Sequence, residues 1–152
     1  WEMHVINKPT GALHGEQVGV ATLMLTRYYH AMRDYDFMRP VNLAATFDRS
    51  YLEPVYGDLT DGILRENLTV GEVSSSPLAF VPDAEKAVKV RAEIDSLISP
   101  EALERLLRLG GAPTTLSELG LPDDEEFIKR TLGFAPYVRK RLTLLKVLSA
   151  KR

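Results

Sequence analysis

Cysteine is absent from the 152-residue chain, which excludes both a disulfide framework and a thiolate metal site. A metal ion bound by this chain would have to be held by histidine, aspartate or glutamate side chains. The sequence also lacks a long apolar run of the kind that spans a membrane, and it has no signal-peptide pattern. From these absences we expect a cytoplasmic protein that does not act at a membrane.

An excess of one charge is also missing. The chain has 19 Lys and Arg residues against 21 Asp and Glu residues, a formal net charge of −2. A balanced chain of this kind is not typical of proteins whose main partner is a nucleic acid. The sequence has no glycine-rich phosphate loop and no serine-centred nucleophile motif. We therefore expect no nucleic-acid partner.

What the sequence does have is repeated helix punctuation, with almost no alternation of period two. Ser99 and Pro100 are typical of a helix start, and Gly110 marks the end of that helix. Residues 115–118 form a capping box, and the acidic run at 123–126 suits the first turn of another helix. The pattern predicts an all-α bundle of roughly seven or eight helices, in a single domain over residues 1–152.

Other segments have weaker signals for the start and end of each helix. Short helices are expected over residues 41–47, over residues 50–56 with a break at Pro54, and over residues 60–67, whereas residues 70–82 are expected to be extended. A helix after Asp83 should bury one face that includes Leu97 and Ile98. The last helix should begin at Pro136 and carry Lys146 towards its C-terminal end, where the helix dipole favours a cation.

The longest expected helix opens with LHGEQVGVATLM at residues 13–24 and should run from His14 to about Arg33. Steps of three and four residues from His14 trace an apolar stripe that we expect to face the core: Val18, Ala21, Leu25, Tyr28 and Met32. His14 heads this stripe beside Gly15, which permits a close approach. A histidine in such a position is usually a core or boundary residue, so the pattern alone does not assign it a ligand.

Four segments, in order along the chain, resemble one enzyme family. LHGEQVGVA at residues 13–21 resembles the His-Gly-Glu segment of the iron-containing alcohol dehydrogenase and dehydroquinate synthase superfamily, most closely its glycerol-1-phosphate dehydrogenase branch. Residues 1–3, 111–121 and 139–145 resemble further segments of that branch, although Leu142 stands where the branch tends to carry an aromatic residue. The resemblance implies the helical C-terminal domain of a two-domain enzyme. Because the chain begins inside one of these segments, we expect a fragment that lacks the N-terminal nucleotide-binding domain.

The resemblance also implies a chemistry. In that branch the histidine matched by His14 is one of three protein ligands of a catalytic metal, and the other two, an aspartate and a histidine, would precede Trp1. Zinc is the expected metal, with iron and nickel as alternatives. The implied reaction is the NAD(P)-linked interconversion of dihydroxyacetone phosphate and glycerol 1-phosphate, in which the metal polarises the carbonyl group. The missing domain would bind most of the NAD(P).

The implied partners are therefore that N-terminal domain and a small phosphorylated substrate. Taken alone, the fragment is expected to be inactive. It is also expected to leave an apolar face around Val18, Ala21 and Leu25 partly uncovered, and for that reason to form homo-oligomers.

Three further residues are candidates for substrate binding or for support of the metal site. Gln17 follows His14 by one turn and could orient a ligand or a substrate hydroxyl, and His4 should lie near the cleft. Arg141, in the basic cluster at 139–141, could recognise a phosphate, although a solvated helix face is the more common explanation of such a cluster. Glu16 is either a first-turn acid or a support for the metal site, and we expect His30 to have a packing role.

Two other functions stay open at this stage. The chain could be a helical interaction or assembly module that keeps the scaffold and performs no chemistry. It could also belong to a related dehydrogenase that acts on glycerol or simple alcohols. Sequence upstream of Trp1 would separate the module from the enzymes, because only an enzyme needs a nucleotide-binding fold and the two missing ligands there.

Overall fold

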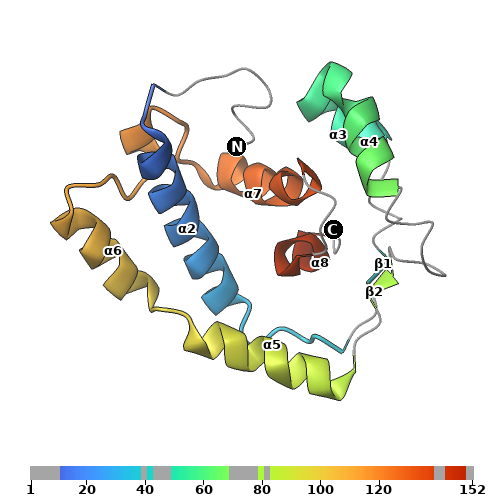
Figure 1. Ribbon diagram of the computed structural model, residues 1–152, viewed down its shortest axis with the longest axis horizontal. Helices are drawn as coiled ribbons and strands as arrows, with labels where there is room; N and C mark the ends of the chain where they lie inside the picture. The colour runs from blue at the N-terminus through green and yellow to red at the C-terminus, as the bar shows by residue number, and fades with distance from the viewer. Residues whose placement is uncertain are drawn as a thin grey trace. The chain divides into compact units, whose positions relative to one another are not determined.

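The computed structural model describes residues 11–38, 41–42, 49–68, 79–80, 83–138 and 143–149 (Figure 1). Its elements, in chain order, are α2 (His14–Ala31), β1 (Val41–Asn42), α3 (Arg49–Tyr56), η2 (Gly57–Leu59), α4 (Thr60–Leu68), β2 (Ala79–Phe80), α5 (Ala84–Ser96), α6 (Pro100–Leu109), η4 (Ser117–Leu119), α7 (Glu125–Phe134), η5 (Ala135–Val138) and α8 (Leu144–Ser149). The expected all-α class is confirmed, with one two-residue strand pair added. Within these ranges, no helix combines the length and the apolar character that crossing a membrane requires.

The chain divides into two compact units. Unit 1 comprises Trp1–Lys8, Arg39–Val81 and Asp124–Arg152, and unit 2 comprises Pro9–Met38 and Pro82–Asp123. The sequence led us to expect one helical domain, and each unit is described by itself below.

The helices of unit 2 begin at the residues that the capping signals predict. Asp83 accepts a hydrogen bond from the backbone N–H of Lys86 at 2.7 Å at the start of α5, and the Ser99 hydroxyl accepts one from Ala102 at 3.2 Å at the start of α6. These side chains satisfy backbone donors that the first turn of a helix leaves unpaired. The expectation that α5 extends to Ile98 was wrong, because the backbone turns extended at Leu97.

In unit 2, α2 packs against α6 and α5. Its buried residues are Val20, Leu23 and Thr26, which share one face at helical spacing. Thr26 is compatible with burial because its hydroxyl donates a hydrogen bond to the carbonyl of Thr22 at 2.8 Å. α2 and α6 approach closely at Gly19, where an added Cβ would lie 3.2 Å from a side-chain carbon of Leu107.

The predicted core-facing stripe of α2 was wrong. Val18 is 48% exposed, Ala21 is also exposed and Leu25 is only half-buried. The reason is that α2 carries apolar residues on two opposite faces, so that helical periodicity does not decide which face packs. In addition, charged residues at the edges of the face that contains Val20 and Leu23 form ion pairs with residues of α5 and α6. These pairs favour packing through that face.

Two ion pairs connect α2 and the residue that follows it to the neighbouring helices. Arg27 pairs with Glu104 of α6 at 2.6 Å, and Arg33, just after α2, pairs with Asp95 of α5 at 2.5 Å. The hydrogen bond from Arg33 is the largest cause that lowers the pKa of Asp95, whereas the pKa of Glu104 is lowered mainly by the hydrogen bond from Arg108 and further by Arg27. Exposed pairs of this kind each contribute a small stabilisation, so the two together favour this register of α2 over others.

The turn at residues 114–120 contains the predicted capping box. The carboxylate of Glu118 accepts hydrogen bonds from the backbone N–H groups of Thr114 and Thr115 at 2.7 and 3.0 Å, and the Thr115 hydroxyl accepts one from the N–H of Glu118 at 3.2 Å. Gly120, with φ of 74°, then closes the short helix η4 in the left-handed region that favours glycine. The local signal was therefore confirmed in full.

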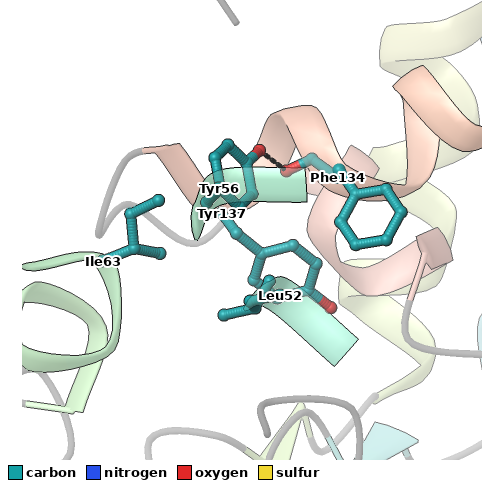
Figure 2. Close-up of a cluster of buried hydrophobic side chains, with 5 residues drawn as sticks. All are labelled: Leu52, Tyr56, Ile63, Phe134 and Tyr137. Carbon is teal, nitrogen blue, oxygen red and sulfur yellow. Dashed lines mark hydrogen bonds between the residues drawn. The ribbon is translucent and has the colours of Figure 1, made fainter. Parts of the chain in front are cut away.

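The core of unit 1 is a cluster contributed by α3, α4, α7 and η5. Figure 2 shows its five side chains: Leu52, Tyr56, Ile63, Phe134 and Tyr137. The buried Tyr56 hydroxyl donates a hydrogen bond to the carbonyl of Phe134 at 2.8 Å. Tyr51 stacks on the ring of Phe134 with a centroid distance of 4.5 Å. Packing of these rings therefore joins α3 to the α7–η5 segment.

Three expectations in unit 1 need correction. The helix expected over residues 41–47 begins instead with strand β1, which pairs antiparallel with β2, Val41 lying opposite Phe80; residues 43–47 lie outside the described part. The β-branched Val41 suits an extended backbone. Pro54 lies inside α3 and does not break it, although its missing N–H removes one backbone hydrogen bond of the helix.

The third correction concerns the last helix. The segment that begins near Pro136 is the short helix η5, and α8 is a separate helix, with residues 139–142 between them outside the described part. Leu145 and Leu148 are buried. Lys146 lies in the last turn of α8, as expected, and it is buried with them.

The packing of unit 1 predicts the effect of one truncation. Leu52→Ala should lower the free energy of unfolding by about 2–5 kcal/mol, because it leaves a cavity beside fully buried aromatic rings. Leu59→Ala, the same change at an exposed position of η2, should cost less than about 1 kcal/mol. Urea unfolding followed by far-ultraviolet circular dichroism measures both. Equal costs for the two variants would contradict the described core.

The capping box predicts a dependence on pH. The backbone hydrogen bond from Thr114, followed by that from the Thr115 hydroxyl, lowers the pKa of Glu118. A lowered pKa stabilises the folded state at neutral pH, and this contribution is lost as the pH falls through the lowered value. Glu118→Gln should therefore reduce stability at neutral pH and reduce it less in acid. Thermal unfolding across this pH range tests the prediction, and a stability difference independent of pH would contradict it.

Candidate metal site at the start of α2

His14 is the first residue of α2, and its side chain is exposed. Leu13 precedes it in an extended conformation, with φ of −65° and ψ of 148°, so the chain enters the helix directly at the histidine. The side chain of Glu16 turns back to accept a hydrogen bond from the N–H of Leu13 at 2.8 Å. Glu16 is an acidic residue of the first turn, as the sequence predicted, and its carboxylate caps the helix. This cap fixes the first turn that carries His14.

Gln17 lies in the same turn and is half-buried. Its side-chain amide donates a hydrogen bond to the carbonyl of Ala12 at 2.8 Å, which ties the preceding segment to the helix. This bond gives Gln17 a structural role beside the role in orienting a ligand that the sequence suggested. Replacement of Gln17 should therefore reduce the stability of the fold more than replacement of His14.

The other two candidates cannot be compared with His14. His4 and Arg141 lie outside the described residues, as do Trp1, Glu2, Met3 and the rest of the basic cluster at 139–141. Across the part of the chain that the structure describes, no three His, Asp or Glu side chains come together as a group that could hold a metal ion. His14 thus fits the place of one ligand, whereas the described residues do not fit a complete metal site.

His30 lies near the other end of α2 and is half-buried. Its Nε2 atom is 3.3 Å from the carbonyl oxygen of Ile98, within unit 2. This contact agrees with the packing role expected for His30, which makes it a natural control for His14.

The surface of α6 carries an open hollow of about 400 Å³, lined by Glu101, Glu104, Arg105, Arg108 and Leu109. Its carboxylate Glu104 is paired with both Arg27 and Arg108, at 2.6 and 3.0 Å. The hydrogen bond from Arg108 is the largest cause that lowers the pKa of Glu104. Arginines therefore already neutralise Glu104, one of the two carboxylates that line the hollow.

Lys146 is a residue of interest that the sequence analysis missed. It is only 5% exposed, and its Nζ donates a hydrogen bond to the side-chain oxygen of Asn67 at 2.7 Å. Burial lowers the pKa of this amine to about 8. A signal was present, because Lys146 is the single charged residue in the apolar run LTLLKVL at residues 142–148. Because its neighbours in the run are mostly apolar, a helix formed by this run offers no polar face for the lysine side chain.

Compared with known proteins, the chain matches no family model, no curated protein and no solved structure. The resemblance at residues 13–21 therefore stays a prediction from the sequence.

The contrast between His14 and Gln17 predicts two different stabilities. His14→Ala should change the free energy of unfolding by less than about 0.5 kcal/mol, since the side chain is exposed. Gln17→Ala should cost about 1 kcal/mol, because it removes the hydrogen bond to Ala12. Urea unfolding of the two variants tests this. A larger loss for His14→Ala than for Gln17→Ala would show that His14 is a packing residue.

Proposed function

We propose that this chain is the metal-binding helical part of a glycerol-1-phosphate dehydrogenase-like oxidoreductase, with His14 as one protein ligand of a divalent metal. Zinc is the metal we favour, and iron and nickel are the alternatives. The observation that carries the proposal is the exposed position of His14 at the first residue of the 18-residue helix α2. A core histidine would be buried, whereas a ligand shared with other segments must be open to them.

The outer face of α2 supports the same proposal. Val18 and Ala21 follow His14 on one side of the helix, and both are exposed. Exposed apolar side chains beside an exposed histidine are typical of a surface that another domain covers. On this proposal the covering element is a nucleotide-binding domain that holds NAD(P).

The proposal requires ligands beyond the described residues. A catalytic metal needs about three protein ligands and an open position, and His14 supplies one of them. The resembled branch completes the set with an aspartate and a second histidine. We propose dihydroxyacetone phosphate and glycerol 1-phosphate as the substrate pair and the cytoplasm as the location.

A second function is favoured by a different observation. Leu106 and Leu109 of α6 are 58% and 75% exposed. Large exposed leucines on one helix face are typical of surfaces that bind other proteins. A helical interaction module would need this face and would not need His14. Replacement of His14 therefore separates the two functions.

The metal content of the protein tests the proposal directly. His14→Ala, introduced into the protein together with its upstream sequence, should reduce bound zinc from about one ion per chain to less than about a tenth. His30→Ala is the matched control, because it removes a histidine of the same helix that contacts Ile98 instead. Elemental analysis of the purified proteins gives both values.

Each result has a clear meaning. Loss of zinc in His14→Ala alone, with the circular dichroism spectrum unchanged, supports the metal site. Equal zinc content in the natural protein and both variants would contradict His14 as a ligand. Absence of bound metal from the natural protein would instead favour the interaction module.

A further inference from the structure

One side of α6 carries large exposed apolar side chains. Leu106 and Leu109 are 58% and 75% exposed, and Ala102 is exposed as well. Because an α-helix turns by about 100° per residue, these three residues lie within about 60° of one another around the helix. Leu107, which approaches Gly19 of α2, lies about 160° from Leu109. The apolar stripe formed by Ala102, Leu106 and Leu109 is therefore centred on a different side of α6 from the side that packs on α2.

Two charges of opposite sign border this apolar stripe. Glu101 and Arg105 are both exposed, and they lie one turn apart along the same side of the helix. Within the residues that the structure describes, neither of them forms an ion pair, although their spacing of four residues would permit one between them. The neighbouring Glu104, by contrast, is already paired with two arginines. Glu101 and Arg105 are therefore available to a binding partner.

The order of these residues along α6 makes the face complementary to itself. Glu101 and Ala102 lie in the first turn of the helix, and Arg105 and Leu106 follow one turn later. In an antiparallel pair of such helices, each Glu101 lies beside Arg105 of the other copy. In the same arrangement, each Leu106 lies over the small Ala102 of the other copy, so that a large side chain meets a small one. A two-fold axis repeats both contacts.

We propose that α6 is a self-association site, at which two copies of the chain pack antiparallel about a two-fold axis through the apolar stripe and the two charges that border it. The apolar side chains supply the attraction, because their contact removes apolar surface from water. The ion pairs set the direction, because in a parallel pair of helices the bordering charges of the two copies would lie on opposite sides of the contact.

Sedimentation equilibrium of the full chain measures this self-association. A contact made by one ten-residue helix of each copy is small, so we expect a weak dimer that forms as the concentration rises. Leu106→Asp should weaken the dimer at least about tenfold, because it places a charge in the apolar contact. Leu59→Asp is the matched control, since it makes the same change at an exposed leucine of η2, and it should leave the dissociation constant within about twofold.

Charge reversal tests the antiparallel arrangement itself. Glu101→Arg alone and Arg105→Glu alone should each weaken the dimer at least about tenfold, because like charges then face each other at both contacts. A mixture of the two variants should form a heterodimer about as tightly as the natural chain dimerises, because both contacts regain opposite charges. A fluorescent label on one variant allows the heterodimer to be followed by sedimentation. The mixture also shows that neither variant has lost the fold of α6.

Three results would overturn the proposal. A natural chain that stays monomeric at high concentration would leave the face of α6 to a different protein. A dimer that persists in Leu106→Asp but is lost in Val18→Asp would place the contact on the exposed face of α2 instead. Charge variants that do not recover when mixed would exclude the antiparallel pairing. The self-association site does not depend on whether His14 binds a metal, so neither test decides the other.

Discussion

Val20 and Leu23 pack one face of α2 against its neighbours in unit 2, and much else depends on that contact. Since a helix has two sides, burying this face turns the opposite face, with His14 and Val18, outwards. Gly19 allows the close approach to α6, and the pair of Arg27 with Glu104 fixes the register. The histidine that could bind a ligand is exposed as a consequence of this packing.

The starts of the helices could be predicted because their signals are local. Asp83 and Ser99 each cap a helix with a bond that spans three residues, and Glu118 does the same in its turn. A side chain that bonds to the backbone three residues away needs no knowledge of the rest of the fold. The all-α class and most helix boundaries follow from such signals.

The buried face of α2 and the environment of Lys146 could not be predicted in the same way. Both faces of α2 contain apolar residues, and the choice between them is made by groups on α5 and α6 that are distant in sequence. Lys146 is buried because Asn67, 79 positions away, provides its acceptor. For the candidate site the sequence predicted His14 as one ligand, and the described residues bring together no group of three His, Asp or Glu side chains that could hold a metal ion.

The proposal that His14 belongs to a metal-dependent dehydrogenase is tested most directly by NADH and NADPH oxidation with dihydroxyacetone phosphate. The assay uses the protein with its upstream sequence, with and without added zinc. We expect turnover that depends on the metal and is lost in His14→Ala. No turnover with or without zinc, in a protein that binds no metal, would contradict the account and leave the helical interaction module as the function.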